Sequence, residues 1–174
     1  MKFNFSKQDI QQLAIRFAYS PNNVEKVIRL CLILDDLNTS EEFAGKLLLK
    51  GGTAINLVAF RNCPRLSVDL DLDFAENTSK EETSQIREAL NLAINKYCAE
   101  NGYKVSDRSN FVMDSKSLLY PTTSGGMDKI KLDINYHSRC HVYPNETTSI
   151  PMPFEIDGTL SVAHLNIVEL FAAR

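Results

Sequence analysis

Three aspartates alternate with leucines in the stretch Arg65-Leu-Ser-Val-Asp-Leu-Asp-Leu-Asp-Phe74. The alternation predicts a strand over 66–74, in which residues two apart point to the same side. Asp69, Asp71 and Asp73 would then share one face. Like charges side by side on a strand are unfavourable without a counter-ion. Mg²⁺ and Mn²⁺ both accept carboxylate ligands, and Mg²⁺ prefers a few of them together with substrate phosphate oxygens. The stretch therefore predicts a divalent-cation site that also holds a phosphorylated substrate.

Two other interpretations of this acidic stretch were considered. An exposed acidic strand face would need no metal, and this alternative stays open on the stretch alone. A calcium-binding EF-hand loop also begins Asp-x-Asp-x-Asp, but it needs Gly after the third Asp and Glu at its twelfth position. Phe74 and Lys80 stand at those two places. The sequence therefore argues against the calcium loop.

A second acidic strand is predicted over 127–137, within which Lys131, Asp133 and Asn135 would face one way. If this strand pairs near the first, Asp133 completes a cluster of three carboxylates. Lys131 beside it would contact nucleotide phosphates or simply balance the charge of Asp133, and both interpretations stay open.

A pair of glycines lies upstream, in Lys50-Gly51-Gly52-Thr53. Glycine lets backbone N–H groups approach a phosphate closely. Thr53 would cap the helix that follows and add a hydroxyl. A plain turn is the alternative. A Walker A loop is excluded because the Gly-Lys-Ser/Thr end is missing.

The elements that must position these residues follow from periodicity and capping signals. A first helical pattern opens at Ser6 and continues to Ala18. Ser20-Pro21, a good N-cap followed by a proline suited to the first helical position, opens a second helix over 20–38. A third helix is expected over 41–49, with a short helical run over 54–60 and a longer helix from the Ser79-x-x-Glu82 capping box to Gly102. Further strands are expected over 103–106 and 110–119, and an ordered loop or an edge strand over 144–158. A last helix is expected over 161–174. The sum is an α/β domain with a mixed sheet of about four or five strands flanked by helices.

Composition fits one soluble globular domain. The 174 residues are 44% hydrophobic, with a net charge of −3. The apolar runs are too short for a bilayer span, and the first residues lack the apolar core of a signal peptide. The four cysteines are far apart, at 31, 63, 98 and 140, so reduced thiols and a cytoplasmic location are expected. His137-x-x-Cys140-His141 and His164 are interpreted as structural rather than catalytic.

The segments KGGTAINL and RLSVDLDLDF resemble those of the AbiEii/AbiGii abortive-infection toxins, a family in the DNA polymerase beta-like nucleotidyltransferase superfamily. The superfamily motif is a Gly-Gly or Gly-Ser turn, an Asp-x-Asp strand and a third Asp on a later strand. The matching residues are Gly51, Gly52, Asp69, Asp71 and Asp133. One departure is the gap of 16 residues between Gly52 and Asp69, which is longer than usual.

The resemblance implies a metal-dependent enzyme, a toxin of an abortive-infection toxin–antitoxin pair, that transfers NMP from an NTP to an acceptor hydroxyl. It implies tRNA as a possible acceptor and a cognate antitoxin as a partner. The catalytic and metal-binding residues would be Asp69, Asp71 and Asp133. The nucleotide-binding residues would be Lys50, Gly51, Gly52, Thr53, Arg65, Ser67 and Lys131. Two alternatives stay open: a protein AMPylating enzyme of the same fold, and an inactive nucleotide-binding module.

The expected organisation is one nucleotidyltransferase domain over 1–174. It would comprise N-terminal helices over 6–49, a catalytic core over 50–158 and the start of a C-terminal helical region over 161–174. The final helical pattern carries no stop signal, and family members are usually longer with a helical C-terminal half. The chain is therefore expected to be part of a longer protein.

Overall fold

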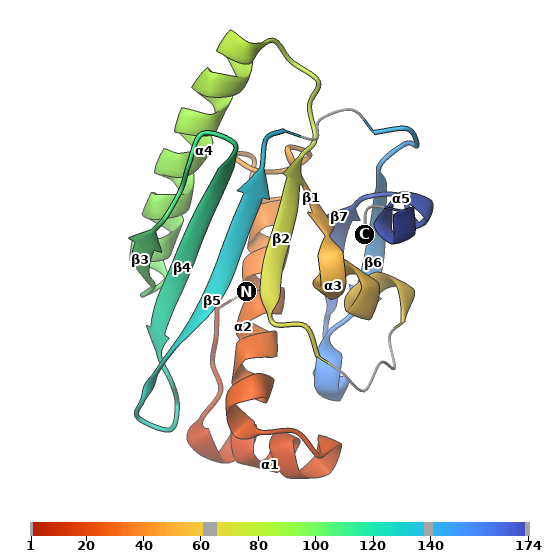
Figure 1. Ribbon diagram of the computed structural model, residues 1–174. Helices are drawn as coiled ribbons and strands as arrows, with labels where there is room; N and C mark the ends of the chain where they lie inside the picture. Colours follow the sequence, from red (N-terminus) through yellow and green to blue (C-terminus); the bar gives the residue numbers. More distant parts are fainter. Residues whose placement is uncertain (1, 61–65, 138–140, 173–174) are drawn as a thin grey trace.

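The computed structural model describes residues 2–60, 66–137 and 141–172, which form one mixed sheet with helices (Figure 1). The sheet has seven strands in the order β3-β4-β5-β2-β1-β7-β6. The α/β class and the mixed sheet are confirmed, whereas the expected number of four or five strands is too small. None of the helices among the described residues is long and apolar enough to cross a membrane.

The central strands are those that the acidic motifs predict. β2 (Asp69–Phe74) pairs in parallel with β5 (Met127–Asn135), and β5 pairs antiparallel with β4 (Met113–Pro121). β1 (Leu47–Lys50) pairs antiparallel with β2 on its other side. The leucines between the aspartates of β2 are buried, as the alternation predicts. β2 therefore has an apolar face in the core and a polar face opposite it.

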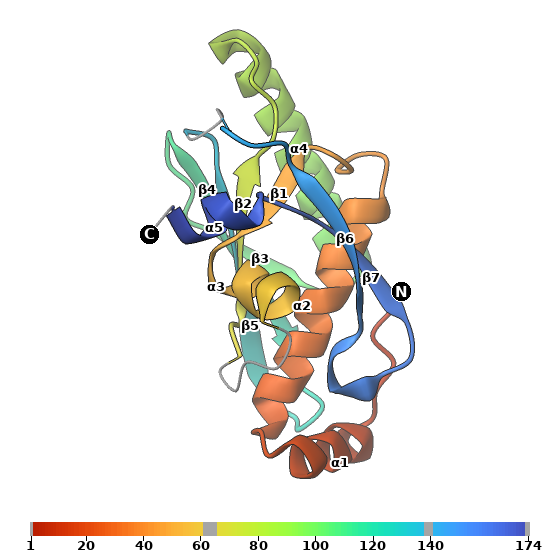
Figure 2. The same cartoon turned by 90° about the vertical axis from the view of Figure 1, so that its right-hand side faces the viewer.

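Two long helices cover the apolar face of the sheet. α2 (Pro21–Thr39) begins after an N-cap serine with proline at its first position, and α4 (Lys80–Glu100) begins at the Ser79–Glu82 capping box. Tyr97 of α4 donates a hydrogen bond to Asp36 of α2, which ties the two helices together. α1 (Lys7–Phe17) crosses the start of α2 (Figure 2). These helix starts confirm the capping signals read from the sequence.

Two predicted helices are wrong. The 41–49 segment is a turn followed by β1, because the buried run Leu47-Leu48-Leu49 lies between two neighbouring strands, where a continuous apolar sequence fits. The first part of the 161–174 segment, residues 161–164, belongs to β7 (Thr159–His164), which pairs antiparallel with β6 (Glu146–Pro151). Only α5 (Ile167–Ala172) is helical there. Of the two alternatives for 144–158, the edge strand is confirmed.

β3 (Lys104–Asp107) forms the edge of the sheet opposite β6. It pairs antiparallel with β4. Gly102 after α4 has a φ of +76°, in keeping with its expected place beyond the helix end. β4 and β5 form an antiparallel hairpin. The sheet thus holds β2 and β5 in its middle, with strands paired on both sides.

Candidate functional site

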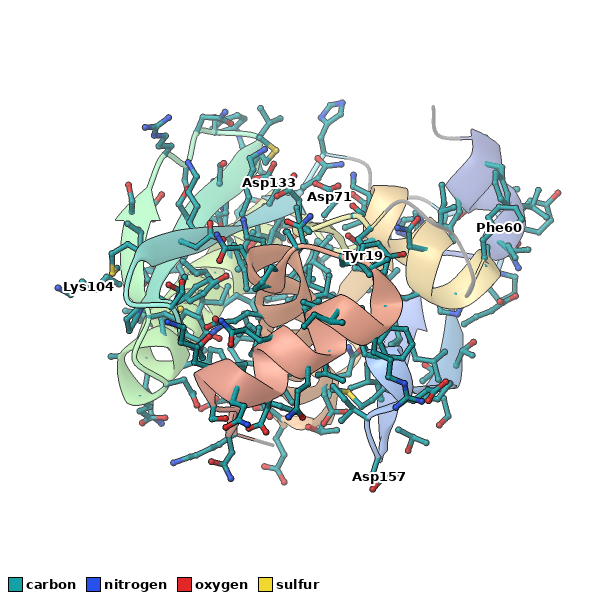
Figure 3. All side chains as sticks on the ribbon, turned by 90° about the horizontal axis from the view of Figure 1, so that it is seen from below. Tyr19, Phe60, Asp71, Lys104, Asp133 and Asp157 are labelled. Carbon is teal, nitrogen blue, oxygen red and sulfur yellow. The ribbon has the colours of Figure 1, made fainter. Side chains whose placement is uncertain are left out.

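The acidic residues of β2 and β5 lie in matching positions on two parallel strands. Asp71 pairs with Asp133, Asp69 with Lys131, and Asp73 with Asn135. Side chains that are directly paired across neighbouring strands point to the same face of the sheet. Figure 3 shows Asp71 and Asp133 side by side. The structure therefore brings the three predicted carboxylates, Asp69, Asp71 and Asp133, to the polar face, opposite the one that α2 and α4 cover.

Asp133 is buried and both of its carboxylate oxygens are engaged. Its Oδ1 accepts a hydrogen bond from the Ser115 hydroxyl at 2.7 Å, and its Oδ2 accepts one from the Lys131 ammonium at 2.6 Å. The bond to Asp133 is also the main reason that the pKa of Lys131 is raised. Lys131 therefore balances the charge of Asp133 in this structure, and its contact with phosphate stays a prediction.

Asp73 lies on the same face but is held by other partners. Its Oδ1 accepts hydrogen bonds from the Lys50 ammonium at 2.6 Å and from the Asn135 amide at 2.9 Å, and the side chain is buried. Lys50 comes from β1, where it pairs with Asp71. Asp73 thus anchors Lys50 beside the acidic pair.

Asp71, unlike Asp73 and Asp133, is not compensated by a neighbouring donor in the described part of the chain. Among the described residues it has no hydrogen-bond partner for its side chain. Burial raises its pKa, and the negative charges of Asp133 and then Asp69 raise it further, against the smaller opposing effects of Lys131 and Lys50. A site with this excess of negative charge favours a bound cation.

The glycine pair packs directly against this carboxylate. Gly51 has a φ of +68°, and a Cβ atom there would lie 2.6 Å from Oδ2 of Asp71. A Cβ on Gly52 would lie 3.0 Å from the Ser67 hydroxyl. Both glycines belong to α3 (Gly51–Ala54), which continues as the short π-helix Ile55–Ala59. The pair is therefore needed for close approach of backbone to the acidic strand, which a plain turn would not require.

Thr53 does not cap the helix as expected. The N-cap of α3 is Lys50, and no side chain makes a capping hydrogen bond there. Thr53 is buried, and its hydroxyl donates to the backbone carbonyl of Asp69 at 2.5 Å. It thus ties α3 to β2, because Asp69 begins that strand. A contact between Thr53 and nucleotide stays a prediction.

The remaining sequence-based assignments have mixed outcomes. Arg65 and Cys140 lie outside the described residues. His164 is buried on β7, where its ring nitrogens bond the Thr148 hydroxyl and the Leu165 carbonyl, so it packs as expected. Ser115 was not singled out from the sequence, because only the register of β4 against β5 places it opposite Asp133.

The donor set fits a hard divalent cation. Carboxylate oxygens suit Mg²⁺ and Mn²⁺. Burial, and after it the charges of Asp133 and Asp69, raise the pKa of Asp71, and the absence of a Cβ at Gly51 leaves room next to Asp71. With the side chains placed as they are in the structure, no three His, Cys, Asp or Glu residues among the described ones form a group that could hold a metal ion. A bound cation would therefore have to compete with Lys131 for Asp133.

Comparisons with known proteins identify the family and the fold. The family model described as "Nucleotidyl transferase AbiEii toxin, Type IV TA system" matches residues 32–173. Among solved structures, MenT4, a nucleotidyltransferase toxin from Mycobacterium tuberculosis H37Rv, superposes with a TM-score of 0.63 at 16% sequence identity. The match covers 98% of this chain and 57% of the MenT4 chain, so this chain spans little more than half of that length. A search of curated proteins gave no match.

Proposed function

The chain belongs to the AbiEii family of nucleotidyltransferase toxins, and we propose that it transfers a nucleoside monophosphate from an NTP to an acceptor hydroxyl in a metal-dependent reaction. The observation that supports this most is the in-register pairing of Asp71 with Asp133 on parallel strands, beside the turn at Gly51. Carboxylates at this place on the fold can hold the cation that an NTP brings with it.

In this proposal, Asp69, Asp71 and Asp133 hold the cation, Mg²⁺ or Mn²⁺. When bound, the cation would lower the pKa of the attacking hydroxyl and stabilise charge on the leaving pyrophosphate. Ser115 and Lys131 orient Asp133 through its two oxygens. In this proposal Asp133 also takes the proton of the acceptor hydroxyl.

The nucleotide would lie between the glycine turn and the lysines of the acidic face. Backbone N–H groups at Gly51 and Gly52 would approach the phosphates closely. A Cβ at these positions would crowd Asp71 and Ser67, respectively. Lys50 and Lys131 would supply positive charge to the triphosphate, together with Arg65, Ser67 and Thr53 as the remaining predicted contacts. The proposed domain organisation places all of these residues in the 50–158 core.

The test is a labelling experiment with each α-³²P NTP in turn. Purified chain is incubated with total RNA and total protein from a bacterial lysate, with Mg²⁺ or Mn²⁺. Label in a tRNA-sized RNA would support the proposed acceptor, whereas label only in protein would show AMPylation. The Asp71→Asn variant serves as the control for activity. NTP binding without pyrophosphate release would show an inactive nucleotide-binding module and would refute the proposal.

The biological part of the proposal is that the chain acts as the toxin of a type IV toxin–antitoxin pair. Expression in a bacterial host is then expected to arrest growth, and co-expression with the cognate antitoxin to restore it. The Asp71→Asn variant should be harmless at the same expression level. Equal arrest by both proteins would separate toxicity from nucleotidyl transfer and refute this part.

A further inference from the structure

Phe111 is a large aromatic side chain that the fold presents to solvent. Its side chain is 81% exposed, although it lies on a short turn directly before β4. The turn is firmly built: the Asn110 side-chain oxygen accepts hydrogen bonds from the backbone N–H groups of Val112 and Met113. Exposing a phenylalanine on an ordered turn gives up the benefit of burying it, which suggests that a ligand covers the ring.

Arg87 of α4 holds this turn in place through hydrogen bonds. Its guanidinium donates to the backbone carbonyls of Phe111 (2.6 Å) and Asn110, and it also bonds the buried carboxylate of Asp114 at 2.6 Å. The same guanidinium lies 4.9 Å from the ring centroid of Tyr136. The position of Phe111 is thus fixed by a buried ion pair that connects α4 to the start of β4.

Phe111 forms one wall of a cavity of about 350 Å³. Lys80, at the first turn of α4, holds its ammonium 5.8 Å from the centroid of the Phe111 ring. Arg87, Tyr136 and His137 line the same cavity, and none of its lining residues is acidic. The cavity has the size of a small-ligand pocket, and it combines aromatic surface with positive charge although the chain as a whole is acidic.

The cavity lies at the end of β5, the strand that carries Asp133. His137 follows Asp133 by four residues, which is about 13 Å at the rise of a strand. Tyr136 donates its backbone N–H to the carbonyl of Val112, so the ends of β4 and β5 stay joined at the cavity. A single strand of a few nucleotides is long enough to cover that distance.

We propose that this cavity binds a base of a single-stranded nucleic acid, stacked on Phe111 with a neighbouring phosphate at Lys80. Aromatic platforms combined with cations are how proteins bind single strands without reading their sequence. The binding itself stands on the cavity alone. A second part of the proposal rests on the proposed function: the bound strand is the acceptor, and its terminal hydroxyl lies at the carboxylates.

The chain contains no tryptophan, which makes a direct test possible. The Phe111→Trp variant carries a single reporter, and stacking of a base on it is expected to quench its emission when a ten-nucleotide oligoadenylate is added without NTP. An abasic oligomer of the same length and charge should leave the emission nearly unchanged. Leu92→Trp is the matched control, because Leu92 is an exposed residue of α4, 67% exposed, and lies outside the cavity.

Affinity of the otherwise unchanged chain is measured by anisotropy of a labelled oligoadenylate. Phe111→Ala should weaken binding by about 5- to 150-fold, the range expected for one stacked base, and Phe111→Tyr should keep it. Lys80→Ala should weaken binding and flatten its salt dependence. Phe111 is exposed, so the melting temperature should stay unchanged in these variants.

Equal quenching by the abasic oligomer, equal quenching of the Leu92→Trp reporter, or unchanged affinity in Phe111→Ala would each overturn the proposal. The readout needs no transfer reaction. A chain that binds oligoadenylate through Phe111 but transfers nothing would leave the cavity assignment intact and would count against the proposed function alone.

Discussion

Replacing Gly51 by alanine tests whether the glycine turn sets the position of Asp71. The new Cβ would lie 2.6 Å from Oδ2 of Asp71, and 3.3 Å from both its Cβ and its Cγ. The backbone at Gly51 has a φ of +68°, a left-handed conformation that costs alanine about 1–2 kcal/mol. The substitution thus combines backbone strain with a steric displacement of the carboxylate.

The two effects have different magnitudes and different readouts. Restoring an ordinary 3.4 Å contact requires Asp71 Oδ2 or the turn to move by about 0.8 Å. A misplacement of about 1 Å at a reacting centre can cost on the order of 100-fold in rate. We therefore expect Gly51→Ala to lose about 10- to 100-fold in nucleotidyl transfer, with a loss of stability of about 1–2 kcal/mol from the strained backbone.

Gly45 supplies the matched control. It has a φ of +76°, but a Cβ there would meet no atom within 4 Å. Gly45→Ala should therefore lose a similar amount of stability in urea unfolding while it keeps its transfer rate and its Mn²⁺ affinity. If both variants lose activity equally, or if Gly51→Ala stays fully active, then the close contact between the turn and Asp71 has no role in the reaction.

Three further outcomes are expected. Asp73→Asn should keep more transfer activity than Asp71→Asn. Its free energy of unfolding in urea should fall by about 1–3 kcal/mol, because the substitution leaves the Lys50 ammonium without its buried carboxylate. Equal loss of activity in both variants would contradict this expectation. Folding raises the pKa of Asp71 above its ordinary 3.8, so its ionisation weakens the fold above that raised pKa and has no effect on stability below pH 3.8. Asp71→Asn should accordingly raise the melting temperature at pH 7, with a gain that shrinks toward pH 4; a constant gain would refute the linkage. Burial raises the pKa of Cys31 to about 12 and that of Cys98 to about 11. Mass spectrometry should therefore find both thiols unlabelled by a thiol reagent at pH 8 until the chain unfolds. Rapid labelling of either thiol would show that it is accessible.

Local signals in the sequence were sufficient for the parts of the fold that local chemistry determines. The helix starts at Ser6, Ser20 and Ser79 follow from side chains that cap backbone N–H groups within three residues. The strand over the aspartates follows from strict alternation, since one face must be apolar and the other polar. Asp133 could be placed on the same face as Asp71 by parity alone, once the two strands were assumed to pair.

The rest depends on contacts between segments that are distant in the sequence. The pattern over 41–49 predicts a helix, but a short apolar run such as Leu47 to Leu49 also fits a buried strand. The presence of β2 and β7 on either side makes this run a strand. His164 lies in a segment with helical spacing that becomes β7 because β6 supplies a hydrogen-bonding edge. The partners of Asp73 and Asp133 could not be read from the sequence, since they follow from strand register.

Lys131 connects these observations, because the two roles considered for it are compatible. In the structure its ammonium bonds Asp133, one of the residues proposed to hold the cation, and its side chain is half exposed. A cation that binds Asp133 would release Lys131, which could then turn to the phosphates of the NTP. Lys131→Met should therefore bind Mn²⁺ alone about two- to fivefold more tightly, as expected for removing a competing surface ion pair. The same variant should bind NTP in the presence of Mn²⁺ more weakly.

Lys129→Met is the control, because Lys129 is also exposed on β5 and its substitution removes the same charge without touching Asp133. Calorimetry with Mn²⁺ alone and with Mn²⁺ and NTP measures both affinities. If Lys131→Met weakens both, Lys131 supports the site without competing for it, and if it changes neither, the ion pair with Asp133 has no part in binding.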